Sequence, residues 1–122
     1  MAKRIRQNES ILQQSCVLWF RTAYPQYKDM LFAVPNGGKR SIITAQRLKK
    51  EGVVSGVPDL FLSLSRNGWH GFYIEMKTGK NTLTPNQTKF FEQAVKYGYK
   101  CEAVYSIDMF IREVNYYLTS KL

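Results

Sequence analysis

The spacing of apolar residues along this 122-residue chain predicts three helices, the first, third and fourth of the chain, and Val95 is expected on the apolar side of the third. The second helix is predicted from its polar cap and from Gly52, which would stop it. A polar cap residue precedes each stretch, and the third also has a proline at its first position and a capping box closed by Gln87. The helices are predicted over residues 9–23, 41–51, 85–97 and from 107 onward, behind the caps Asn8, Ser41, Thr84 and Ser106.

Between these helices lie four shorter runs that are rich in aromatic and β-branched residues, which is typical of strands. The runs over residues 57–62 and 72–77 are separated by a turn signal at residues 65–68, and they are predicted to form an antiparallel hairpin. The run over residues 100–105 follows a helix, so we expect it to lie parallel to its neighbour. The remaining strand is predicted over residues 30–34.

The order of elements is therefore α-β-α-β-β-α-β-α, within a chain long enough for one domain over residues 1–122. Mixed connections of this kind predict an α/β fold, in which helices flank one mixed sheet of about four strands.

Two carboxylates and a lysine stand in the predicted hairpin, where an unpaired charge is costly. Asp59 and Glu75 lie within apolar runs, and Lys77 follows Glu75 by two positions, so that it projects from the same face. A hairpin register centred on Asn67 places Asp59 opposite Glu75, with Cβ atoms about 4.5–5.5 Å apart. Two facing carboxylates repel each other unless a cation compensates them. The pattern predicts a divalent metal site and makes the chain a candidate metal-dependent phosphodiesterase.

The net charge of +9 favours a polyanionic partner, either nucleic acid or an anionic membrane surface. No run approaches the roughly 20 apolar residues that span a bilayer, and the basic N-terminus lacks the apolar segment of a signal peptide. Cys16 and Cys101 are expected to be buried thiols, because two cysteines and one histidine are too few for a four-ligand zinc site. A cytoplasmic location without membrane binding fits these features.

Three motifs resemble those of the VRR-NUC domain, a virus-type replication-repair nuclease of the PD-(D/E)XK, restriction-endonuclease-like, superfamily. Pro58-Asp59 and Glu75-Met76-Lys77 match the superfamily signature. The resemblance extends over residues from about 9 to about 105 and implies a restriction-endonuclease-like fold. The motifs are Ser55-Gly56-Val57-Pro58-Asp59-Leu60, Ile74-Glu75-Met76-Lys77 and Leu83-Thr84-Pro85-Asn86-Gln87, and Val34-Pro35-Asn36-Gly37-Gly38 is similar to the family's upstream turn.

The resemblance implies a role for each matching residue of the site. Asp59 and Glu75 would bind Mg²⁺ or Mn²⁺ together with the backbone carbonyl of Met76, since oxygen ligands suit these ions. Lys77 would position or activate the attacking water and stabilise the charged transition state. Glu9 matches an acidic residue that adds a metal contact, although an acidic residue near a helix start also complements the helix dipole. Gln87 would support the site from the next helix, serve the capping box, or do both.

Several basic or polar residues are candidates for DNA contacts. Asn36, Lys39 and Arg40 form either a plain turn with a solvated basic pair or a phosphate contact, in which glycines let the backbone approach DNA. Lys80 lies just beyond the hairpin, where it could reach a backbone phosphate. The aromatic residues of the last helix are either core or part of a dimer contact.

The resemblance implies a metal-dependent endonuclease that cleaves branched DNA, such as Holliday junctions or flaps, as a homodimer. Two-fold symmetry would place two active sites on opposed strands of a junction. A bacterium or a phage-infected host cell would be its setting. Three other functions stay open from the residues: a DNA-binding module without catalysis, a sequence-specific restriction-type endonuclease, and a ribonuclease.

Overall fold

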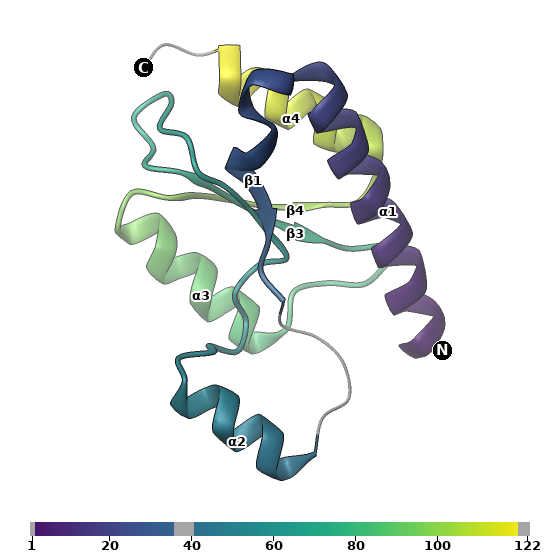
Figure 1. The fold of residues 1–122 in the computed structure, drawn as a ribbon, viewed down its shortest axis with the longest axis vertical. Coiled ribbons are helices and arrows are strands. Elements are labelled where there is room, and N and C mark those ends of the chain that lie inside the picture. The colour runs from purple at the N-terminus through teal and green to yellow at the C-terminus, as the bar shows by residue number, and fades with distance from the viewer. Residues whose placement is uncertain (1, 36–40, 120–122) are drawn as a thin grey trace.

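A four-stranded mixed sheet with the order β1-β2-β3-β4 forms the centre of the computed structural model, which describes residues 2–35 and 41–119 (Figure 1). β1 pairs with β2 and β2 with β3 in antiparallel orientation, whereas β3 and β4 are parallel. The predicted mixed sheet and its parallel last strand are therefore confirmed. The strands are β1 (Leu31–Ala33), β2 (Leu60–Leu62), β3 (Phe72–Met76) and β4 (Lys100–Val104).

Helices cover both faces of the sheet (Figure 1). α1 (Ala2–Ala23) and α4 (Ile107–Thr119) pack side by side on one face, and α3 (Pro85–Lys96) covers the other. The short 3₁₀ helix η1 (Pro25–Met30) connects α1 to β1. α2 (Ile42–Lys50) projects from the body of the domain and has no buried residue. Within the two described ranges no helix is long and apolar enough to cross a membrane.

The core lies between the sheet and the pair of helices α1 and α4. Phe20 of α1 and Phe72 of β3 are fully buried there. Tyr117 of α4 is 1% exposed and its hydroxyl donates a hydrogen bond of 2.6 Å to the carbonyl of Leu64, whereas Tyr116 is 63% exposed. The aromatic residues of the last helix were expected to be either core or part of a dimer contact, and Tyr117 belongs to the core.

The predicted register of the central hairpin is confirmed. Leu60 pairs with Ile74 and Leu62 with Phe72, so that the pairing is centred on Asn67. Asn67 and Gly68 have φ angles of 52° and 81°, the left-handed conformation that a two-residue hairpin turn requires. One step further along the same register, Asp59 stands opposite Glu75.

The predicted start of the first helix is wrong. α1 begins at Ala2, so Asn8 lies inside the helix and does not cap it. The preceding residues include alanine, lysine, arginine and glutamine, which are good helix formers. Their propensity outweighs the cost of one asparagine in the helix interior.

Two smaller expectations also need correction. Pro25 occupies the first position of η1, a site that suits proline, and η1 ends at Met30. The first strand is therefore shorter than predicted, Leu31–Ala33. Val95, expected on the apolar side of α3, is 46% exposed, because the helix packs on the sheet through the row that contains the buried Ala94.

Both cysteines are free thiols; Cys16 is buried, as expected, whereas Cys101 is only half-buried. Burial raises the pKa of each thiol to about 12. Neither is a reactive thiolate at neutral pH, because the thiolate fraction is negligible so far below the pKa.

Candidate active site

Asp59 and Glu75 come together at the end of the central hairpin. Asp59 follows the buried Pro58 and directly precedes β2, and its Oδ2 accepts a hydrogen bond of 2.8 Å from the backbone N–H of Met76. Its carboxyl group also lies close enough to that of Glu75 for each to shift the pKa of the other. With both groups ionised, two negative charges would stand side by side and repel each other.

Lys77 lies beside Glu75 and is buried with it. Both residues are 4% exposed, and the Nζ of Lys77 is 3.6 Å from the Oε2 of Glu75. Strand alternation points both side chains to one face, as predicted. The backbone N–H of Lys77 donates to the carbonyl of Val104 at 2.9 Å, which continues the pairing of β3 with β4 by one residue. The Lys77 cation and the Glu75 carboxyl group are therefore held together out of bulk water, beside the half-buried Asp59.

Burial is the main influence on the ionisation of the two carboxyl groups. It raises the pKa of Glu75 to about 8, with a further increase from the neighbouring charge of Asp59 and a decrease from Lys77. Burial also raises the pKa of Asp59, against the lowering effect of the Met76 N–H. A pair that keeps a proton at neutral pH can exchange it for a divalent cation, which relieves the same repulsion. The carboxyl groups of Asp59 and Glu75 are therefore suitable oxygen ligands for a divalent metal ion.

Gln87 uses its side-chain amide for two purposes. Its Oε1 accepts a hydrogen bond of 2.9 Å from the backbone N–H of Thr84, which completes the predicted capping box. Its Nε2 donates a hydrogen bond of 3.0 Å to the Oε2 of Glu75. Gln87 therefore links the start of α3 to the carboxylate of Glu75 and restricts its orientation. A catalytic role of Gln87 stays a prediction.

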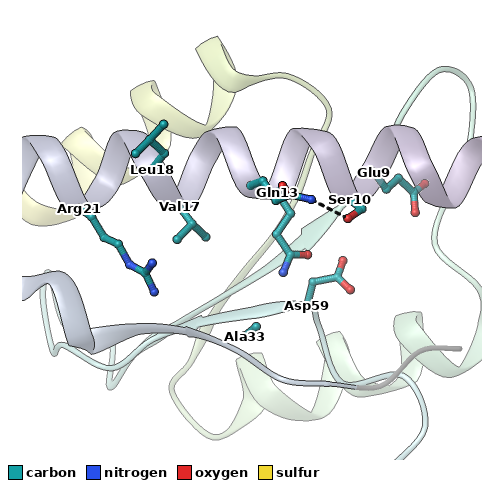
Figure 2. A pocket seen from close by; sticks show the side chains of 9 residues that line it. Glu9, Ser10, Gln13, Val17, Leu18, Arg21, Ala33 and Asp59 are labelled. Carbon is teal, nitrogen blue, oxygen red and sulfur yellow. Dashed lines mark hydrogen bonds between the residues drawn. The ribbon is translucent and has the colours of Figure 1, made fainter.

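Glu9 lies on α1 and lines the same cleft as Asp59 (Figure 2). Its Oε2 accepts a hydrogen bond of 3.0 Å from the Nδ2 of Asn81, whose carbonyl in turn accepts one of 2.9 Å from the Tyr105 hydroxyl. Across residues 2–35 and 41–119 no group of three or more His, Cys, Asp or Glu side chains could hold a metal ion. Glu9 thus stands near the Asp59–Glu75 pair without forming a three-carboxylate site with it.

Of the candidate DNA-binding residues, the structure describes only Lys80, which lies outside this buried group. Lys80 is exposed, three residues beyond Lys77. Asn36, Lys39 and Arg40 lie outside the described residues. The sequence interpretation missed Asn81, since no local signal shows that it contacts a glutamate 72 positions away.

The raised pKa of Glu75 predicts that the protein in EDTA becomes less stable as the pH rises. The folded protein keeps this proton up to about pH 8, whereas the unfolded chain releases it near pH 4.5. Between these values the folded state binds up to one more proton, so the free energy of unfolding falls by at most about 1.4 kcal/mol per pH unit. This contribution is fully present below about pH 4.5 and lost above about pH 8.

Urea denaturation in EDTA between pH 6 and pH 9 measures this dependence. Glu75→Gln is the matched variant, because its amide imitates the protonated carboxyl and does not titrate. Its free energy of unfolding should change less with pH than that of the wild type. The same pH dependence in both proteins would contradict the assignment.

A mixed α/β sheet with paired carboxylates and a buried lysine at the end of its central hairpin is characteristic of a nuclease-type domain. The chain belongs to the VRR-NUC domain family, since the family model matches residues 1–108. A solved structure titled "VRR_NUC domain protein" is 27% identical, with a TM-score of 0.79, and the match covers 93% of this chain and 89% of that one. No curated protein matches the chain. Membership of this family implies DNA as the substrate class.

Proposed function

We propose that this protein is a Mg²⁺- or Mn²⁺-dependent endonuclease that hydrolyses phosphodiester bonds in branched DNA. One observation carries the proposal: the carboxyl groups of Asp59 and Glu75 interact at the end of the hairpin, with the Lys77 Nζ 3.6 Å from Glu75. A structural role alone would not explain why Glu75 and Lys77 are buried beside the half-buried Asp59, because burial of an ionisable group costs solvation energy.

Asp59, Glu75 and the backbone carbonyl of Met76 are the groups that would hold the ion. All three offer oxygen atoms, which suit Mg²⁺ and Mn²⁺ better than Zn²⁺ or Cu²⁺. A bound ion of this kind supplies a more acidic water and neutralises charge on the phosphate.

The remaining groups of the site act on the substrate or on the two carboxylates. Lys77 provides a positive charge where negative charge develops on the phosphate oxygens in the transition state. Its burial strengthens this effect, because the local dielectric constant is lower than that of water. The Met76 N–H orients Asp59, and Gln87 orients Glu75. Hydrogen bonds of this kind keep ligands in place before the substrate arrives.

Branched DNA and a homodimer are the finer parts of the proposal. The family resemblance supports both, and the net charge of +9 supports binding of DNA. A surface for self-association is available on α2, where Ile42 and Ile43 are 77% and 79% exposed. A symmetric dimer would present two active sites to the two strands that leave a branch point.

The test is a cleavage assay with labelled single-stranded, duplex, flap and four-way-junction DNA, each with Mg²⁺, Mn²⁺ or EDTA. The proposal predicts that the wild type cuts the flap or the junction only when metal is present, and that Asp59→Asn does not. Binding without cleavage in every condition would favour a DNA-binding module. Cuts at one sequence in random duplex would favour a restriction-type enzyme.

A further inference from the structure

A cleft of about 520 Å³ extends along α1, with the Asp59 carboxylate at one end (Figure 2). Ala33, the last residue of β1, lines the side opposite the helix. Glu9, Gln13, Val17 and Arg21 line the helix side, and they are spaced four residues apart, so they form one row along a single face of α1.

The two ends of this row carry opposite charges. The carboxylates of Glu9 and Asp59 lie at one end, and Arg21 lies at the other. Figure 2 shows the Arg21 side chain turned into the cleft, and no carboxylate of the described residues forms an ion pair with it. An arginine in the last turn of a helix often only complements the helix dipole. The direction of this side chain favours an anionic ligand in the cleft instead.

We propose that the cleft holds one DNA strand beside the scissile phosphate, and that Arg21 binds a phosphate of that strand. This inference rests on the proposed nuclease function. From residue 9 to residue 21 the helix rises about 18 Å, at about 1.5 Å per residue. That length corresponds to about five phosphate steps at the B-form rise of about 3.4 Å, and to fewer in a stretched strand. Arg21 is thus a phosphate anchor remote from the reacting atoms.

The lining of the cleft suits the sugar–phosphate backbone rather than the bases. Arginine binds phosphate oxygens through two parallel N–H groups. Ser10 and Gln13 offer a hydroxyl and an amide that can bond to sugar or phosphate oxygens. None of the described residues that line the cleft is aromatic, so bases find no ring to stack on. Binding here is therefore independent of sequence.

Arg21→Gln is expected to reduce the salt dependence of DNA binding by one phosphate contact. The slope of log K against log salt concentration should become shallower by about 0.7–0.9. Fluorescence anisotropy of a labelled flap in EDTA measures binding without cleavage, over NaCl concentrations from about 50 to about 200 mM.

Two further variants make the comparison specific. Arg112→Gln on α4 removes the same charge from a side chain that is 70% exposed and outside the cleft, so its slope should equal that of the wild type. Leu18→Lys adds a cation at the cleft, three residues before Arg21, at a position that is 68% exposed. Its slope should become steeper by a similar amount.

Strands with a single uncharged methylphosphonate linkage locate the contact. Replacing the phosphate that Arg21 contacts by a methylphosphonate should weaken binding by the wild-type protein. The same replacement should not weaken binding by Arg21→Gln, because that variant has already lost the contact. The inference would be overturned if the wild type and Arg21→Gln had equal salt slopes and lost equal affinity for the methylphosphonate strands. Metal-dependent cleavage by both would then leave the proposed function intact, whereas a wild type that neither binds nor cuts DNA would contradict both proposals.

Discussion

Lys77→Met is expected to lower kcat for DNA cleavage by about 10²–10³-fold, the usual effect of removing one group that stabilises transition-state charge. The lysine is 4% exposed and its Nζ lies 3.6 Å from Glu75, so water cannot readily take its place. Methionine keeps most of the length of the side chain and removes only the charge. KM should change little, because the charge acts on the transition state more than on the bound substrate.

The stability of Lys77→Met should move in the opposite direction from its activity. A buried ammonium has lost its hydration, and an apolar replacement of similar size removes that cost. The carboxyl of Glu75 is not left charged and unpaired at neutral pH, since its pKa is already about 8. Thermal unfolding in EDTA should therefore give a Tm equal to or above that of the wild type, the trade-off expected of a functional site.

Single-turnover cleavage of the preferred DNA, with Mn²⁺ at saturation, measures the loss. Lys96→Met is the matched control, since it removes a charge from an exposed lysine in the last turn of α3. It should retain the wild-type rate. Lys77→Met with a wild-type rate would show that the reaction does not use this lysine.

Gly56→Ala is expected to lower the free energy of unfolding by about 2–5 kcal/mol and to reduce cleavage as well. Gly56 has a φ of +90°, which costs a residue with a side chain about 1–2 kcal/mol. Its added Cβ would also overlap the backbone of Asn86, with the carbonyl carbon at 2.6 Å and the amide nitrogen of Gln87 at 3.0 Å. Overpacking of this kind adds about 1–3 kcal/mol.

The overlap involves the segment that holds Glu75. The loop before Asp59 docks on the start of α3, where the Nδ2 of Asn86 donates to the Ser55 hydroxyl at 3.0 Å. Displacing Asn86 displaces Gln87, whose amide bonds Glu75. A shift of about 1 Å in a catalytic group can cost about 10²-fold in rate. We therefore expect kcat to fall by about that factor in the fraction that stays folded.

Gly52→Ala separates the two effects. Gly52 also has a positive φ, +105°, but a Cβ there would meet nothing within 4 Å. It should lose only about 1–2 kcal/mol, with kcat unchanged. Urea denaturation and single-turnover cleavage of both variants make the comparison. Equal losses of stability in the two would contradict the packing argument, and a normal kcat in Gly56→Ala would contradict the link to Glu75.

Sequence reasoning succeeded where neighbouring residues decide the structure. The capping box of Thr84 and Gln87 forms within four residues, and the apolar faces of β2 and β3 fix the register of the hairpin. That register brought Asp59 and Glu75 together, and strand alternation placed Lys77 beside Glu75. Half of the site could thus be derived from the period-two alternation of the two strands.

Sequence reasoning failed where the structure depends on contacts between remote segments or on competing local preferences. The start of α1 depended on helix propensity outweighing the Asn8 cap signal. The bond from Asn81 to Glu9 and the packing of Gly56 on Asn86 join segments that no local pattern connects. The position of Val95 on the outer side of α3 depends on how the helix is rotated against the sheet.

The sequence by itself determined the order of elements, the mixed sheet, the hairpin register and the identity of the carboxylate pair with its lysine. These follow from hydrophobic periodicity, caps and turns, which act over a few residues. Only the tertiary structure decided how deeply Glu75 and Lys77 are buried, that Gln87 serves both its cap and Glu75, and that Arg21 shares a cleft with Asp59. Burial and the meeting of distant segments result from packing the whole chain, and the electrostatics of the site depend on both.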